Sequence, residues 1–151
     1  ERIVKGELAL QDDRGIIRNY MLPEPITMVG WITAERVEGR NVVRANHYHP
    51  EQEQKVLIIS GSYISVYKDL GADSPIRHHL VRAGDLVITP PNVAHAMIFL
   101  TDTLILNLVH GDRDQKNFAQ HTVKYQLVDP ENHSKLREYL DHYQGKLNNG
   151  L

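Results

Sequence analysis

Short runs of strand-forming residues, separated by turn residues, recur along most of this 151-residue chain. Residues 63–67 show the pattern, because Ile64 and Val66 occupy one face of the run and Tyr63, Ser65 and Tyr67 occupy the other. Turn residues interrupt the chain at 12–15, 38–41, 69–75, 83–85 and 90–92. Many short strands at this spacing predict an all-β sandwich or barrel.

The last part of the chain follows a different period. Asp129 is a suitable N-cap, and Pro130 suits the first position of a helix. Apolar residues then recur at i, i+4 and i+7, at Leu136, Leu140 and Tyr143. Gly145 is a plausible helix end. We therefore predict an amphipathic helix over residues 130–144, packed on the barrel or on a second subunit.

The composition excludes several classes of protein. A formal charge of −2 lacks the excess of Lys and Arg that a nucleic-acid groove or a polybasic membrane surface needs. The chain has no Cys, which excludes disulfides and thiolate metal sites. No apolar run approaches the roughly 18 residues that span a bilayer, and no signal-peptide pattern opens the chain. We expect one cytoplasmic domain over residues 1–151, with its barrel at about 3–128.

Two histidine motifs stand out. His47 and His49 are two residues apart, so a strand would point both imidazoles to the same face. His95 follows Gly84 and Pro90 at the start of another expected strand. Three neutral imidazoles, with the side-chain oxygen of Gln54, would also suit Fe, Zn, Ni or Mn. The motifs therefore indicate either an acid–base site or a metal site inside the barrel.

These stretches resemble the two motifs of the cupin superfamily over residues 39–99. The first motif matches at Gly39, His47, His49 and Gly61, and the second matches at Gly84, Asp85, Pro90 and His95. The resemblance implies a cupin double-stranded β-helix (a jelly-roll-like barrel) with a C-terminal α-helix. It also implies a homodimer, because cupins commonly pair through edge strands. The chain departs from the family at Gln54, where the usual metal ligand is Glu.

A narrower resemblance is to the nucleotide-sugar cupins: the dTDP-4-keto-6-deoxysugar 3,5-epimerases, the 3,4-ketoisomerases and the cupin domain of capsular polysaccharide epimerases. It is carried by residues 12–15, 44–47, 67–70 and 90–96. His47 matches the general base of the epimerases, and Gln54 matches a Gln of the ketoisomerases. The partner Tyr of the epimerases would fall near Asn107 or Leu108, where this chain has none. The resemblance therefore favours a ketoisomerase or a single-centre epimerase, in polysaccharide biosynthesis.

The preferred hypothesis is an isomerase or epimerase of a nucleotide-linked 4-keto-6-deoxy sugar. A keto group acidifies the neighbouring C–H, and a His with a near-neutral pKa can move that proton through an enediolate. His47 would be the base and His49 the second acid–base group, with no cofactor required. Three cations are candidates for the phosphates: Arg44, Lys55 and Arg14. Arg44 lies at an odd offset from His47, so a regular strand would point it to the opposite face.

Two alternatives use the same residues. The first is a metal-dependent cupin oxygenase or lyase acting on a small molecule, with His47, His49, Gln54 and His95 as metal ligands. The second is a non-enzymatic sugar-binding cupin. The other six histidines are expected at the surface: His78, His79, His110, His121, His133 and His142.

Overall fold

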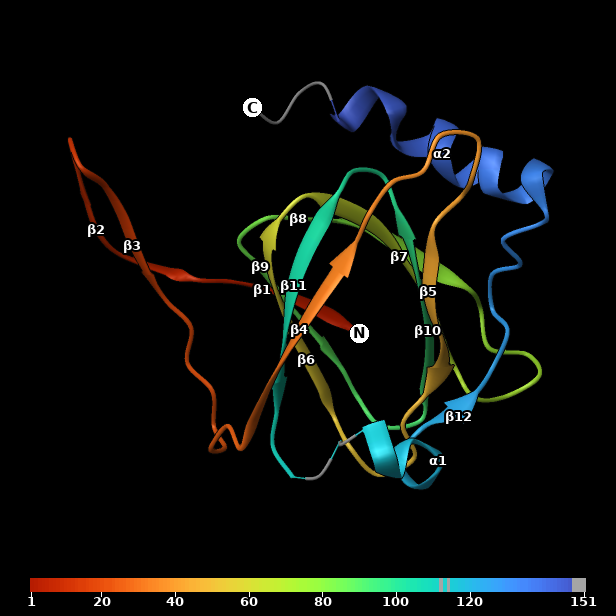
Figure 1. The fold of residues 1–151 in the computed structure, drawn as a ribbon, viewed down its shortest axis with the longest axis horizontal. Coiled ribbons are helices and arrows are strands. Elements are labelled where there is room, and N and C mark those ends of the chain that lie inside the picture. Colours follow the sequence, from red (N-terminus) through yellow and green to blue (C-terminus); the bar gives the residue numbers. More distant parts are fainter. Residues whose placement is uncertain (112, 114, 148–151) are drawn as a thin grey trace.

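Two five-stranded antiparallel sheets face each other and form a barrel (Figure 1). The computed structural model describes residues 1–111, 113 and 115–147. The first sheet has the order β1 (Arg2–Lys5), β9 (Asp85–Thr89), β6 (Gln54–Ser60), β11 (Thr103–Val109) and β4 (Met28–Ala34). The second has the order β12 (Val123–Lys124), β5 (Val43–Tyr48), β10 (Val93–Phe99), β7 (Ser62–Asp69) and β8 (Arg77–Arg82). The predicted all-β barrel is confirmed.

Apolar side chains from both sheets fill one part of the barrel interior. This inner core includes Val56, Ile58, Tyr63, Val81, Val87, Phe99 and Ile105. On β10 the alternation of a strand assigns the faces, because Met97 and Phe99 belong to the inner core while Ala96 and Ile98 face outward. His95 lies two residues before Met97 on β10 and therefore on the same face, so its side chain also enters the barrel.

Gly61 joins β6 to β7 in a turn that only glycine fits. Its φ is +85°, and a Cβ atom there would lie 2.2 Å from the carbonyl oxygen of Asp102. Both the backbone conformation and the close approach therefore exclude a side chain. The glycine of the first predicted motif thus forms the turn at which the chain passes from the first sheet to the second.

The C-terminal helix α2 (His133–Leu147) covers the outer face of the second sheet (Figure 1). Its Leu136, Tyr139 and Tyr143 pack against Ile64 and Ile98 in a second apolar cluster. The predicted helix is therefore present, but it begins three residues later than expected.

The cap of α2 explains the later start. The side chain of Asn132 accepts a hydrogen bond from the Lys135 amide at 3.1 Å, the N-cap to N3 geometry. Asp129, the predicted cap, instead accepts from the Glu131 amide in a preceding turn. The predicted stop at Gly145 is also wrong, because α2 continues through it to Leu147. Within the part of the chain that the structure describes, no helix is long and apolar enough to cross a membrane.

Strands β2 (Glu7–Asp12) and β3 (Gly15–Asn19) form a hairpin that extends away from the barrel (Figure 1). Four of its large apolar side chains are exposed: Leu8, Leu10, Ile16 and Ile17. A two-stranded hairpin is at best marginally stable by itself in water. We call residues 7–19 the arm.

Candidate active site

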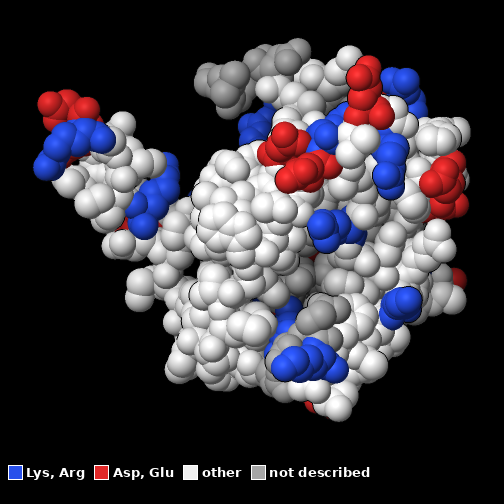
Figure 2. Space-filling model, viewed as in Figure 1, with Lys and Arg blue, Asp and Glu red and all other residues white. Residues whose placement is uncertain are grey.

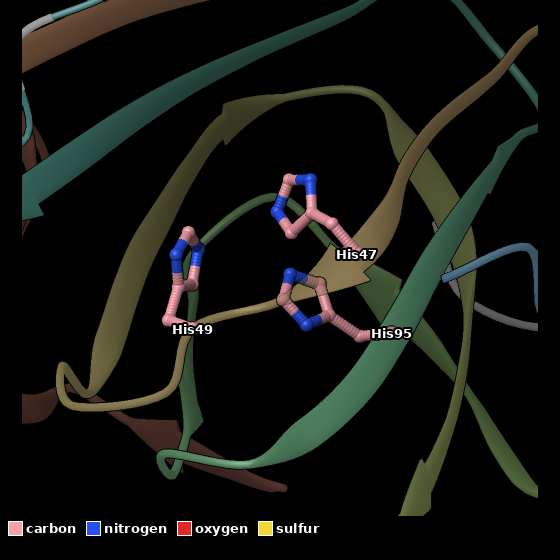
Figure 3. A group of neighbouring side chains, drawn as sticks. All are labelled: His47, His49 and His95. Carbon is pink, nitrogen blue, oxygen red and sulfur yellow. The ribbon is translucent and has the colours of Figure 1, made fainter. Parts of the chain in front are cut away.

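Three imidazoles converge inside the barrel (Figure 3). His47 lies on β5 directly opposite His95 on β10, and His49 follows β5. The ring centroid of His47 is 4.8 Å from that of His49 and 4.7 Å from that of His95. One nitrogen from each ring lies within 4.8 Å of the other two. The structure therefore brings together the three histidines that the two sequence motifs predicted.

Backbone carbonyls fix the tautomers of two of these rings. His49 Nδ1 lies 2.8 Å from the carbonyl oxygen of His121, and His95 Nδ1 lies 3.1 Å from that of Val93. A carbonyl only accepts, so each Nδ1 carries the proton and each Nε2 carries a lone pair. The Nε2 atoms of His47, His49 and His95 are buried and have no hydrogen-bond partner among the described residues. The chain thus aims unpaired imidazole nitrogens at one point.

The environment keeps these imidazoles neutral. Burial, followed by the neighbouring His95 and His49, lowers the pKa of His47 to about 3. Burial, followed by the nearby charge of Arg113, lowers the pKa of His49 to about 3. Burial also lowers the pKa of His95. These pKa values lie well below the near-neutral value that the sequence-based hypothesis expected. An anion in the pocket would raise them.

The same residues fit a divalent metal. Three neutral imidazole nitrogens with unpaired lone pairs form a donor set that suits Zn, Fe, Ni or Mn. Gln54 is 7% exposed, and its buried Oε1 also has no hydrogen-bond partner among the described residues. Gln54 also lines the cavity, so its oxygen would be the fourth ligand of the set that the sequence predicted.

A cavity of about 280 Å³ opens beside the histidines. Its polar lining includes His47, His49, Gln54, Asn107, Arg113 and His121, and its apolar lining includes Ile32, Met97 and Phe118. Phe118 belongs to α1 (Phe118–His121), which follows the short 3₁₀ helix η1 (Gln115–Asn117) at one end of the barrel (Figure 1). The cavity therefore combines acid–base groups, a cation and apolar surface.

Arg44 lines this cavity, although its odd offset from His47 predicted the opposite face. The reason is a β-bulge in β5. His47 pairs with His95 and Ala45 pairs with Ala96, so Asn46 has no partner in β10. One extra residue reverses the alternation, and Arg44 then pairs with Met97, which also lines the cavity. Arg44 is exposed and therefore lies at the mouth.

The structure does not bring the other two predicted cations to the cavity. Lys55 neighbours Gln54 on β6 and so points to the opposite side, where its Nζ lies 2.9 Å from a carboxylate oxygen of Glu53. Arg14 lies at the tip of the arm and pairs with Asp12 at 2.5 Å. Within one chain, Arg44 is therefore the one of the three that remains a candidate for phosphate binding.

Arg113 is the most important pocket residue that the sequence did not reveal. Its side chain is 8% exposed, and burial lowers its pKa to about 10. Its Nε donates to Gln52 Oε1 at 2.7 Å, and a terminal nitrogen donates to the carbonyl oxygen of Glu53 at 3.0 Å. These two bonds hold a guanidinium in the cavity wall. No motif includes Arg113, so sequence patterns had no signal for it.

Asn107 has a weaker sequence signal, because the resemblance to the nucleotide-sugar epimerases places their Tyr near Asn107 or Leu108. Its side chain lines the cavity, and its buried Oδ1 has no hydrogen-bond partner among the described residues. Asn107 therefore contributes an amide, and not a phenol, to the cavity wall.

Three of the six histidines expected at the surface are half-buried instead. His121 lines the cavity and its carbonyl holds His49. His79 Nε2 lies 2.7 Å from a carboxylate oxygen of the buried Glu1. His78 lies beneath α2, with its Nδ1 2.8 Å from the Tyr143 hydroxyl. The other three are exposed as predicted: His110, His133 and His142.

Comparisons with known proteins identify the fold. No family model matches the chain. No curated protein sequence matches it either. Several solved structures do match. A 3,4-ketoisomerase from Helicobacter canadensis matches with a TM-score of 0.66 and 17% identity, over 82% of this chain and 89% of that chain.

Two further matches belong to the same group of enzymes. QdtA, a sugar 3,4-ketoisomerase from Thermoanaerobacterium thermosaccharolyticum, matches with a TM-score of 0.63 and 19% identity, over 96% of this chain and 95% of that chain. NovW, a 4-keto-6-deoxy sugar epimerase from Streptomyces spheroides, matches with a TM-score of 0.66 and 18% identity, over 85% of this chain and 70% of that chain. These structures belong to the cupin superfamily, and the chain has the cupin fold.

Proposed function

We propose that this protein is an isomerase or epimerase that acts on a nucleotide-linked 4-keto-6-deoxy sugar. The observation that carries the proposal is the position of His47. Its buried Nε2 has no hydrogen-bond partner among the described residues, and its side chain lines a cavity that also contains Arg113. A neutral base beside a fixed cation is what enolisation of a keto sugar requires. The matching structures named as ketoisomerases and epimerases support the same reading.

In the proposed mechanism, the keto sugar lies in the cavity with an acidic C–H next to its carbonyl. His47 Nε2 takes this proton, the C–H electron pair becomes the new C=C bond, and the carbonyl oxygen becomes the enediolate oxygen. Arg113 stabilises that negative charge, which in turn raises the pKa of the imidazoles and favours the proton transfer. For the ketoisomer, a proton is returned to the former carbonyl carbon, the former carbonyl oxygen is protonated, and the hydroxyl on the neighbouring carbon loses its proton to become the new carbonyl. Return of the proton to the original carbon from the opposite face gives the epimer. His49 is the proposed second acid–base group.

The volume of the cavity supports a division of the substrate into two parts. About 280 Å³ lies just below the usual range of about 300–1,000 Å³ for ligand sites, so it suits one sugar ring better than a whole nucleotide sugar. Arg44 lies at the exposed mouth, where a pyrophosphate would leave the barrel. We propose that the sugar enters and the nucleotide stays outside.

Incubation with TDP-4-keto-6-deoxyglucose, followed by proton NMR, tests this function. We expect new sugar signals from a 3-keto isomer or an epimer. Tight binding without conversion would instead indicate the non-enzymatic sugar-binding alternative. Neither binding nor conversion of TDP- and UDP-linked keto sugars would contradict the proposal.

A metal-dependent cupin reaction is the second candidate, because one nitrogen from each of the three histidines lies within 4.8 Å of the other two, and their buried Nε2 atoms have no hydrogen-bond partner among the described residues. His47, His49, His95 and Gln54 would hold the ion, which would polarise a bound oxygen atom as a Lewis acid. Elemental analysis of untagged protein tests this candidate. Near-stoichiometric Fe, Ni or Mn that is lost in His95→Ala would favour an oxygenase or lyase. Metal-free protein that still converts the keto sugar would exclude a metal from the reaction.

We also propose that the protein is a cytoplasmic homodimer held together by the arm. The outer face of the first sheet exposes Val29, Trp31 and Ile59, and Trp31 is 71% exposed. Figure 2 shows a broad uncharged surface beside the arm, whose tip carries charges of both signs. Exposed apolar patches of this kind mark protein interfaces. A second copy whose arm lies on this face would bury both apolar surfaces at once.

Changing Trp31 to Glu is expected to dissociate this dimer. Light scattering should give twice the chain mass of 17.3 kDa for the wild type and 17.3 kDa for the variant. Val37→Glu, at another exposed apolar residue of lower exposure, is the control and should remain dimeric. A wild-type protein that is monomeric at micromolar concentration would contradict the proposal.

A further inference from the structure

The two residues directly before His47 have a backbone conformation that is rare outside glycine. Ala45 has φ +68° and Asn46 has φ +54°, both within strand β5. Left-handed conformations of non-glycine residues are disfavoured and persist only where the surroundings enforce them. Such outliers cluster at functional sites. Something must therefore hold this segment of β5.

The bulge has a direct consequence for the pocket. Because Asn46 has no partner in β10, Arg44 and His47 lie on the same side of the sheet and both line the cavity. In a regular strand, one of the two would point outward, toward the apolar cluster that Ala96 and Ile98 form with α2. The bulge therefore makes it possible for one strand to supply both the base and the cation at the mouth.

The side chain of Asn46 uses its whole amide to hold this conformation. Its Nδ2 donates to the carbonyl oxygen of Val128 at 2.8 Å. Its Oδ1 accepts from the amides of Leu127 at 3.0 Å and Val128 at 2.9 Å. The Asn46 carbonyl oxygen also accepts from the Tyr125 amide at 2.8 Å. Four hydrogen bonds thus join the bulge to residues 125–128.

The segment that Asn46 anchors also reaches His49. Residues 125–128 continue from β12, which pairs with β5 at Tyr48 and His47. Just before β12, the carbonyl oxygen of His121 accepts from His49 Nδ1, and the Thr122 hydroxyl lies 3.2 Å from the same nitrogen. Asn46 is therefore joined to His47 along β5 and to His49 through β12.

We propose that Asn46 is a positioning residue that sets the geometry of both catalytic imidazoles through the bulge and the anchored segment. Its role in turnover rests on the proposed function, whereas its effect on the imidazoles does not. Asn46 is not among the residues that line the cavity, and in this proposal it acts through His47 and His49.

The test compares Asn46→Gly, Asn46→Asp and a matched control, Asn92→Gly. Glycine accepts the left-handed conformation and removes only the side-chain hydrogen bonds. Asp keeps the two acceptor bonds and loses the donor. Asn92, with φ +60°, is the control because it is an Asn in the same conformation, exposed where Asn46 is half-buried. Its backbone amide donates to the carbonyl oxygen of His49 at 2.8 Å, a bond that glycine keeps.

The first readout is the ¹⁵N spectrum of the imidazoles, which needs no substrate. Asn46→Gly should keep the fold but shift or broaden the His47 and His49 signals, and Asn92→Gly should not. The second readout is turnover of the keto sugar. We expect kcat to fall about 10- to 100-fold in Asn46→Gly, with KM within about twofold, because small misplacements of reacting groups are that damaging. Asn46→Asp should recover part of that loss.

Unchanged imidazole signals in a folded Asn46→Gly protein would overturn the proposal, whether or not the keto sugar is the substrate. So would imidazole shifts of equal size in Asn92→Gly. If the wild type converts no keto sugar, the proposed function fails, while the imidazole spectra still decide the role of Asn46.

Discussion

Replacing His47 with Asn should lower kcat for keto-sugar conversion by about 10³-fold, within the range of about 10²–10⁴ for general acid–base groups. The Asn side chain fills part of the imidazole volume but cannot accept a proton at neutral pH. Binding of TDP should stay within about threefold, since the nucleotide is proposed to lie outside the barrel. Steady-state kinetics and calorimetry measure the two quantities.

His133→Asn is the matched control for this prediction. His133 is exposed at the start of α2 and lies outside the cavity of His47. The His133→Asn protein should retain full activity and stability. If the folded His47→Asn protein converted the keto sugar at a rate near that of the wild type, His47 would not be the base, and the mechanism would be wrong.

Replacing Arg113 with Gln should lower kcat by about 10²-fold, because the loss of one group that stabilises an oxyanion typically costs about 10²–10³-fold. Gln is neutral, and its side chain is too short to restore both hydrogen bonds to Gln52 and Glu53. The positive charge of Arg113 also lowers the pKa of His47 and His49, so its loss should move both pKa values upward. Kinetics and a histidine NMR titration would measure the two effects.

Arg113→Lys keeps a charge and should recover part of the activity, which separates electrostatics from packing. Arg36→Gln is the control, since Arg36 is exposed and hydrogen-bonds to the carbonyl oxygen of Leu100 away from the cavity. Full activity in Arg113→Gln would show that the guanidinium only holds its own segment to Gln52 and Glu53, just before β6. A downward shift of the histidine pKa values would contradict the electrostatic account.

Local patterns predicted the barrel and the three histidines, because alternation and turn residues are local properties. The same alternation could also have placed Lys55, since an inward Gln54 requires an outward neighbour. The helix was predicted to start at Pro130, because a suitable N-cap, Asp129, directly precedes a proline that suits the first helical position. The structure uses Asn132, whose side chain caps the Lys135 amide.

Arg44 and Arg113 could not be placed from sequence, for two different reasons. The side to which Arg44 points depends on a bulge held by residues 125–128, about 80 positions away in the chain. Arg113 lies in no motif and reaches the cavity only because Gln52 and Glu53 hold it there. Both placements depend on long-range hydrogen bonds, which residue periodicity does not encode.

The most direct test of the central claim is solvent exchange in D₂O. TDP-4-keto-6-deoxyglucose is incubated with wild-type protein and with His47→Asn, and the sugar protons are followed by NMR. The account predicts that wild-type protein replaces a proton next to the keto group with deuterium and that His47→Asn does not. No deuterium incorporation by folded wild-type protein that binds the substrate, or equal incorporation by both proteins, would contradict it.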